Sequence, residues 1–174
     1  FKAHPYGNGV IGHSSDIESF HRRDARDFFE KYYVAPNMTV CVVGDVTVEQ
    51  VKKLAKKYFK YVRCGEDPPP VTTVEPVHQA EFRVVAEEDA NPVAILGWQC
   101  PAAGHEDYAG MELVMEILGT GRSSRLYQRL VKEEQVATRV GAGTDMPGMK
   151  YANQAVVFVF CAENRDPEEA IVRA

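Results

Sequence analysis

The stretch GTGRSSRLYQRLVKEEQVAT, residues 119–138, holds two glycines, two serines and three arginines around the predicted start of a helix. Glycine adopts the backbone angles of tight turns at little cost, so the glycines predict a turn between two helices. Ser123 or Ser124 is placed to cap the second helix through its hydroxyl. Leu126 and Leu130, at i, i+4 spacing, predict that one face of this helix is packed.

The glycines and arginines of this stretch also raise the possibility of an anion site. A Walker loop needs Gly-x-x-x-x-Gly-Lys-Ser/Thr and a dinucleotide fingerprint needs Gly-x-Gly-x-x-Gly after a strand, and the stretch satisfies neither. An anion could still bind the free amides at the helix start. The candidate loop, for an anion or for structure alone, comprises Gly119, Gly121, Arg122, Ser123, Ser124 and Arg125.

The flanking sequence predicts the fold around this loop. A helix is expected at 107–118, with Met111, Leu113, Val114, Ile117 and Leu118 facing inward, and another helix begins at Asp166. Strands are expected at about 80–87, 92–98, 136–144 and 152–162. Pairs of strands separated by helices favour an α+β fold, with a mostly antiparallel sheet and helices packed on one face.

The first part of the chain is too small to enclose its own core. It predicts a helix at 22–33, a strand at 38–43 and a helix opened by a Thr47–Gln50 capping box. Prolines then crowd residues 64–79, which indicates a stiff linker. We therefore expect residues 1–63 to end one domain and residues 80–174 to begin another.

Composition excludes several function classes. The net charge is −5 and lysines are interspersed with acidic residues, which argues against a nucleic-acid partner. No apolar run reaches the ~18 residues of a membrane span. The chain opens on Phe1 rather than methionine, and the helix from Asp166 has only about two turns, so we expect part of a longer protein; the compartment stays unknown.

Chemistry-bearing residues form no recognised active site. The five histidines show no i, i+4 pair with a carboxylate, so no zinc site is expected. His13 beside Ser14 and Asp16 supplies the residue types for nucleophilic catalysis, but no nucleophile elbow surrounds them. The cysteines lie far apart, which predicts buried free thiols; they are Cys41, Cys64, Cys100 and Cys161.

Three motifs resemble one family in order along the chain. They are HPYGNGVIGHSSDI (4–17), FFEKYYVAPNMTVCVVGDV (28–46) and ILGTGRSSRLYQRLVKEEQVAT (117–138). Together they are similar to the pitrilysin/insulinase family of zinc peptidases, which includes the mitochondrial processing peptidase and core subunits of the cytochrome bc complex.

The resemblance implies two α+β domains that close around an extended peptide. Residues 1–63 would end the zinc-type domain, and residues 80–174 would begin the second, non-catalytic domain. Zinc in this family sits on a His-x-x-Glu-His helix, whose glutamate serves as the general base. That motif is absent here, so zinc is expected in the longer parent, and this chain should bind none and hydrolyse nothing alone.

One departure from the family concerns a catalytic helper pair. Many members place an arginine and a tyrosine, seven residues apart, after the second-domain helix, where they hold substrate and stabilise the oxyanion. Those positions fall on Val131 and Thr138. The pattern suits the zinc-bearing subunit of a pair or a degenerate non-catalytic assembly subunit. The resemblance implies a peptide substrate for the parent, and the unpaired apolar faces of residues 20–60 indicate a homologous subunit or a second copy as a partner.

Overall fold

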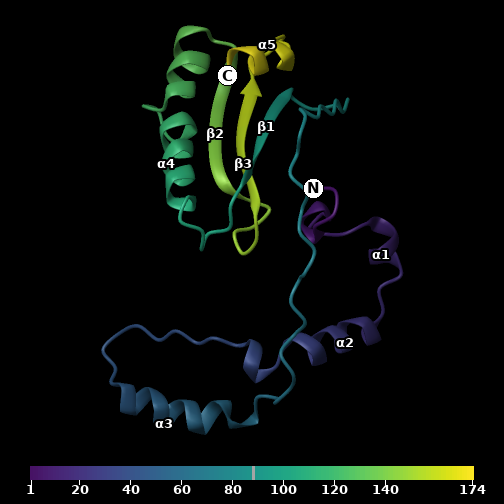
Figure 1. Cartoon of the computed structure of the whole chain (residues 1–174), viewed down its shortest axis with the longest axis vertical. Helices are drawn as coiled ribbons and strands as arrows, with labels where there is room; N and C mark the ends of the chain where they lie inside the picture. Colours follow the sequence, from purple (N-terminus) through teal and green to yellow (C-terminus); the bar gives the residue numbers. More distant parts are fainter. Residues whose placement is uncertain (88) are drawn as a thin grey trace. The chain divides into compact units, whose positions relative to one another are not determined.

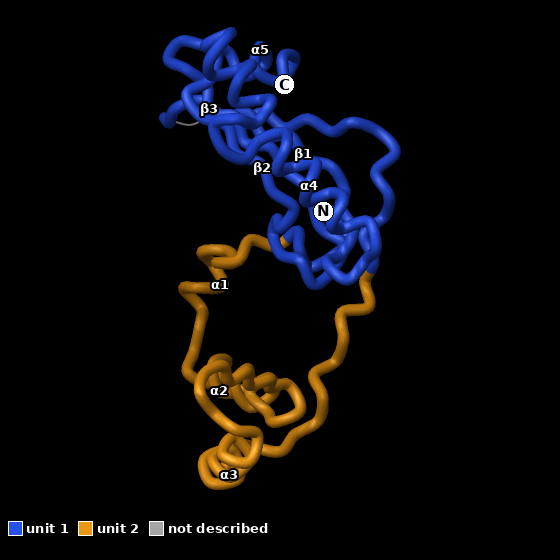
Figure 2. The backbone as a smooth tube through the Cα atoms, turned by 90° about the vertical axis from the view of Figure 1, so that its left-hand side faces the viewer, with its two compact units in different colours: residues 1–7, 74–174 blue, residues 8–73 orange. Residues whose placement is uncertain are grey.

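The chain divides into two compact units. The computed structural model describes residues 1–87 and 89–174. One unit comprises residues 1–7 and 74–174, and the other comprises residues 8–73 (Figure 2). Seven N-terminal residues thus join the second half of the chain. The division into two incomplete domains with a linker at 64–79 stays a prediction.

An antiparallel sheet forms the centre of the larger unit. The strands are β1 (Val93–Cys100), β2 (Ala137–Met146) and β3 (Asn153–Cys161), and β3 lies between the other two (Figure 1). Leu96 of β1 and Ala142 of β2 both pair with Val157. This arrangement confirms the α+β fold with an antiparallel sheet.

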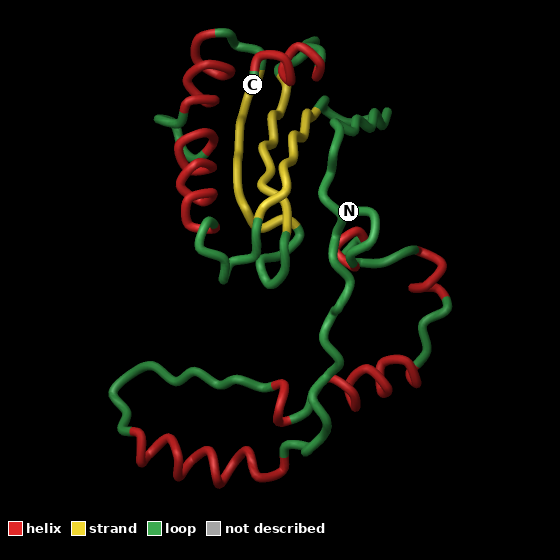
Figure 3. The backbone as a smooth tube through the Cα atoms, viewed as in Figure 1, coloured by secondary structure: helices red, strands yellow, loops and turns green. Residues whose placement is uncertain are grey.

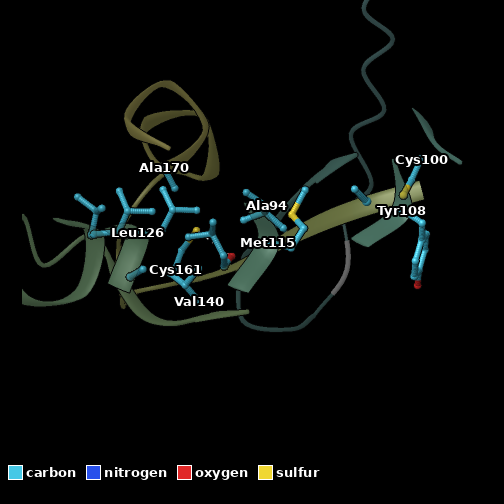
Figure 4. Close-up of a cluster of buried hydrophobic side chains, with 14 residues drawn as sticks. Ala94, Cys100, Tyr108, Met115, Leu126, Val140, Cys161 and Ala170 are labelled. Atoms are coloured by element: carbon cyan, nitrogen blue, oxygen red, sulfur yellow. Dashed lines mark hydrogen bonds between the residues drawn. The ribbon is translucent and has the colours of Figure 1, made fainter. Parts of the chain in front are cut away.

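The core forms where helices meet one face of this sheet. α4 (Tyr108–Gly119) packs against β2, and the π-helix η4 (Tyr127–Glu133) follows it. The sequence of β3, NQAVVFVFC, is apolar at nearly every position, as expected for a central strand. Figure 4 shows the buried cluster, whose labelled members include Ala94, Met115, Leu126 and Cys161.

α4 is apolar on more than one face, which changes which residues it buries. Leu113, Val114 and Ile117 are 62%, 45% and 47% exposed, so the prediction that they face inward is wrong. The stripe that meets the sheet is instead the one at i, i+3, i+7 and i+10, because that spacing keeps one helix face. It comprises Tyr108, Met111, Met115 and Leu118.

The end of the chain is tied to the end of η4. α5 (Pro167–Arg173) begins at Asp166, whose carboxylate accepts a hydrogen bond from the Glu168 amide at 2.9 Å, as the sequence predicted. Arg173 Nη1 donates to Glu134 Oε2 at 3.0 Å. This ion pair, with a second one from Arg129, lowers the pKa of Glu134.

The smaller unit, residues 8–73, contains three α-helices. They are α1 (Ser14–Glu18), α2 (Arg22–Tyr32) and α3 (Val48–Tyr58); 3₁₀ turns lie at Ala35–Asn37 and Phe59–Tyr61, and a third, Pro5–Gly7, belongs to the larger unit. The predicted capping box at α3 is confirmed. The Gln50 amide donates to Thr47 Oγ1 at 3.2 Å, and the Thr47 amide donates to Gln50 Oε1 at 2.8 Å.

Two predicted strands are absent among the described residues. Residues 38–43 and 80–87 form no ladder and belong to loops (Figure 3). A strand gains its stability from a partner strand, and no strand of residues 8–73 is described that could pair with 38–43. The apolar residues of both segments accordingly stay exposed, including Val40, Phe82 and Val84.

Candidate functional site

The glycines of the 119–125 loop are required by the backbone. Gly119 ends α4 where the helix touches β2, and a Cβ there would lie 2.5 Å from the Cβ of Ala142. Gly121 has a φ of +78°, in the left-handed region that favours glycine. Gly119 therefore allows α4 to approach β2, and Gly121 allows the turn between α4 and the next helix.

Ser124 closes this turn from inside. Its side chain is 4% exposed, and its Oγ donates to the Gly121 carbonyl at 2.8 Å. The Ser124 carbonyl accepts the Gln128 amide at 3.0 Å, which begins the helix. The predicted cap thus differs in detail, because the hydroxyl donates to the turn rather than accepting a helix amide. Ser123 is exposed.

The two arginines of the loop form no ion pair with an acidic side chain among the described residues. Arg122 and Arg125 are both exposed, and no ion pair within residues 1–87 and 89–174 includes them. The Arg122 carbonyl accepts a hydrogen bond from the Gln128 side chain. Anion binding by this loop stays a prediction, whereas packing against β2 explains Gly119 and the turn explains Gly121 and Ser124.

The two residues predicted to occupy the positions of the family's helper pair, Val131 and Thr138, lie on two different elements. Val131 lies in η4 and packs, half-buried, against the core. Thr138 lies in β2, beyond a turn at Gln135 with φ of +51°, and its Oγ1 donates to the Phe160 carbonyl at 3.2 Å. Valine has no donor, and the threonine donor is engaged with the sheet.

The described residues do not fit a zinc ion. No group of three or more His, Cys, Asp or Glu side chains within residues 1–87 and 89–174 is placed to hold a metal. Cys100 and Cys161 are buried, and this burial raises the pKa of both thiols. Cys41 and Cys64 are exposed, so the prediction of burial is wrong for these two, which lie in loops.

The sheet carries a second apolar face that the sequence analysis did not single out. Register places Ile95 beside Phe158, and Val93 and Arg139 beside Phe160. The Arg139 guanidinium lies 4.5 Å from the centre of the Phe160 ring, a cation–π contact. The sequence feature that could have revealed this face is the unbroken apolar run of 155–161, because such a run puts apolar side chains on both faces of a strand.

A carboxylate ties the N-terminal residues to the larger unit. The amides of Lys2, Ala3 and His4 donate to the Glu75 carboxylate at 2.6, 2.9 and 2.9 Å. His4 is 6% exposed, and its ring lies against Tyr6 and Tyr151, with centroids 4.6 and 5.1 Å away. We call this set of contacts the clasp. No local sequence pattern pointed to it.

The clasp predicts that the thermal stability of the larger unit depends on pH. The His4 amide, then those of Ala3 and Lys2, holds the pKa of Glu75 at about 2, against an ordinary value of 4.5. A lowered folded-state pKa stabilises the fold above the ordinary value, and the stabilisation disappears as pH falls toward the folded value. We expect Glu75→Gln to lower the Tm near neutral pH, and the difference from wild type to vanish between about pH 4.5 and about pH 2.

Thermal melts of both proteins across this pH range check the prediction. Glu106→Gln is a matched control, because Glu106 is exposed and has no described ion pair. A difference in Tm that stays constant down to pH 2 would contradict the role given to the carboxylate charge.

The fold defines the class, an α+β domain with an antiparallel sheet and a helical layer. Residues 19–172 match the family model described as the peptidase M16 inactive domain. The chain therefore belongs to the peptidase M16 family, and its resemblance to the pitrilysin/insulinase zinc peptidases is confirmed.

Curated relatives are named zinc proteases. The zinc protease PqqE of Helicobacter pylori is 31% identical over 140 residues, which cover 78% of this chain and 32% of the relative. An uncharacterized zinc protease of Mycobacterium leprae is 24% identical over 93% of this chain and 36% of its own length. The chain thus spans about a third of the length of these relatives.

Solved structures agree with the fold. A protease from Helicobacter pylori superposes with a TM-score of 0.88 and 26% identity, covering 99% of this chain and 43% of that one. A peptidase M16 inactive domain from Pseudomonas fluorescens has a TM-score of 0.69 and 20% identity, over 91% of this chain and 38% of that one. Among the described residues, no helix has the length and apolar character needed to cross a bilayer.

Proposed function

We propose that this chain is the domain junction and second-domain portion of a zinc metallopeptidase. In this proposal the zinc and its general base belong to the parent protein, outside these residues, and hydrolysis takes place on a peptide enclosed between two domains. The observation that carries the proposal is the match of residues 19–172 to the inactive domain of a zinc peptidase family.

The geometry favours a role in contacting a peptide rather than in catalysing its hydrolysis. The described residues offer no metal ligand set. Val131 and Thr138 are the residues predicted to stand where the family has its arginine and tyrosine. What the unit does offer a peptide is the apolar sheet face of Ile95, Phe158 and Phe160. Phe158 and Phe160 are half-buried and Ile95 is 60% exposed, so this face can contact a peptide without rearrangement of the core.

Activity and metal content of two proteins test the proposal. We expect this chain to cleave no peptide from a quenched fluorescent library, with or without added zinc, because it lacks the ligands that activate water. The full-length parent should contain a His-x-x-Glu-His helix, bind about one zinc per chain and cleave the library. A parent that lacks the motif and the metal would overturn the proposal.

A second candidate is a non-catalytic assembly subunit of the same fold. The predicted loss of both helper residues, at Val131 and Thr138, is expected for this candidate as well as for a zinc-bearing subunit. This candidate predicts a parent that copurifies with a homologous partner and contains no zinc by metal analysis. The metal content therefore separates the two functions.

A further inference from the structure

The helix α3 of the smaller unit is basic, although the chain as a whole is acidic. Residues 48–63, which include α3 and the 3₁₀ turn Phe59–Tyr61, hold six basic residues and one acidic residue, a net charge of +5, whereas the whole chain has −5. The lysines of this segment are exposed, and none forms an ion pair within residues 1–87 and 89–174; they are Lys52, Lys53, Lys56, Lys57 and Lys60. Their charge is therefore available to a partner.

The opposite face of α3 is apolar and largely uncovered. At about 100° per residue, Val51, Leu54 and Tyr58 fall on one stripe, and the five lysines fall on the other side of the helix. Leu54 and Tyr58 are 51% and 63% exposed, and Phe59, which follows on the apolar side, is 49% exposed. Among the described elements, α3 packs closely only against the turn that follows it, and Figure 1 shows it between two loops.

Two of the lysines border this apolar stripe. Lys52 precedes Phe59 by seven residues, about two turns, so the two share one side of the helix, and Lys57 lies next to the stripe on its other side, toward Leu54. A lysine at such a border lays its apolar stem along the stripe and keeps its charged end in water. Tyr61, 82% exposed, adds an aromatic ring with a polar tip, a combination enriched at membrane–water boundaries.

We propose that α3 lies flat on the surface of a bilayer that contains anionic phospholipids. In this arrangement the apolar stripe enters the headgroup boundary by about 5–10 Å and the lysines lie near the lipid phosphates, as for other lysine-rich amphipathic helices. Each basic residue near an anionic surface strengthens binding about fivefold. The negative charge elsewhere on the chain opposes this little, because charges more than about 10 Å away are largely screened at roughly 0.1 M ionic strength. The surface is independent of the proposed peptidase function.

Two other occupants match only part of this surface. A nucleic acid would contact the lysines but leave Leu54, Tyr58 and Phe59 exposed to water. The same segment of a second copy would cover the apolar stripe but bring more lysines, and its one acidic residue is Glu49. An anionic bilayer matches both the charge and the apolar stripe.

Co-sedimentation of the full chain with lipid vesicles tests the charge side of the proposal. We expect binding to vesicles of phosphatidylcholine mixed with phosphatidylglycerol, and this binding should weaken as salt is added. Binding to phosphatidylcholine alone should be at least about tenfold weaker. No binding to the mixed vesicles, or equal binding to both kinds, overturns the proposal.

Paired variants locate the binding to α3. Lys52→Gln with Lys57→Gln should weaken binding to the mixed vesicles at least about tenfold, because both charges lie near the headgroups. Lys132→Gln with Lys150→Gln makes the same change in net charge outside α3, at two exposed positions, and should leave the affinity unchanged. Equal weakening by the two pairs contradicts the assignment to α3.

The apolar side is tested by a reporter on the stripe. Tyr58→Trp should give fluorescence that vesicles with brominated acyl chains quench, beyond any quenching in wild type, whose single tryptophan is Trp98 of β1. Leu54→Gln with Phe59→Gln keeps every charge and should weaken vesicle binding at least about tenfold, since two apolar side chains leave the buried face.

Three results of these measurements would assign the surface elsewhere. Absence of quenching, or full vesicle binding by the Leu54→Gln, Phe59→Gln variant, would show that no apolar side chain enters the bilayer. Tighter lysine-dependent binding to double-stranded DNA than to the mixed vesicles would assign the lysines to a nucleic acid. A dimer in sedimentation that persists with vesicles and becomes monomeric in the Leu54→Gln, Phe59→Gln variant would assign the stripe to a second copy. Each of these outcomes overturns the proposal.

Discussion

Leu130→Ala is expected to destabilise the larger unit by roughly 3 kcal/mol, because it removes a fully buried side chain and leaves a cavity. Leu130 has 0% exposure and lies between η4 and the sheet in the buried cluster. Such a loss is a large fraction of the ~5–15 kcal/mol that holds a typical domain together. Urea unfolding followed by circular dichroism measures it.

Leu113→Ala serves as the matched control for this experiment. Leu113 is also a helical leucine of the same unit, but it is 62% exposed. Its truncation should change the free energy of unfolding by less than about 0.5 kcal/mol, as for other surface substitutions. Comparable effects of the two variants would show that the buried face of the helical layer has been assigned wrongly.

Gly119→Ala is expected to destabilise the unit by about 1–3 kcal/mol, because the added methyl group overpacks the contact between α4 and β2. The new Cβ would lie 2.5 Å from Ala142 Cβ and 3.0 Å from the Ala142 backbone nitrogen. The backbone contact prevents relief by a simple rotamer change. Equilibrium unfolding of the variant, compared with wild type, checks the magnitude.

Two further variants isolate the cause. Gly110→Ala lies on the same helix, where a Cβ meets nothing within 4 Å, so it should stabilise by up to about 1 kcal/mol. Ala142→Gly combined with Gly119→Ala should recover part of the loss, since one of the two close contacts disappears. Destabilisation by Gly110→Ala equal to that by Gly119→Ala would mean that the contact with Ala142 is not the reason.

Helices were predictable from the sequence, but their buried faces were less so. The apolar spacing indicated a helix near 107–118, and α4 occupies Tyr108–Gly119. Because this helix is apolar nearly all round, its pattern could not distinguish Leu113, which is exposed, from Met115, which is buried. Only the packing of α4 against β2 decides between these faces.

Strand pairing and long-range contacts could not be predicted from local sequence patterns. Residues 38–43 have the composition of a strand, but a ladder needs a second strand, and the structure describes none in residues 8–73. The turn after α4, at Gly121, was predicted from the glycines of the loop. Glu75 had no such signal, since its partners lie more than 70 residues away in sequence.

The clasp also constrains the order of events on the ribosome. Lys2 and Glu75 are 73 positions apart, and the rings around His4 include Tyr151. At typical translation rates, Lys2 waits roughly 4–15 s before Glu75 is synthesised, and longer before Tyr151. Residues 2–4 are thus placed only after the distant residues that hold them have been synthesised. Nascent-chain truncations ending before Tyr151 should therefore leave residues 1–7 open to proteases and chaperones.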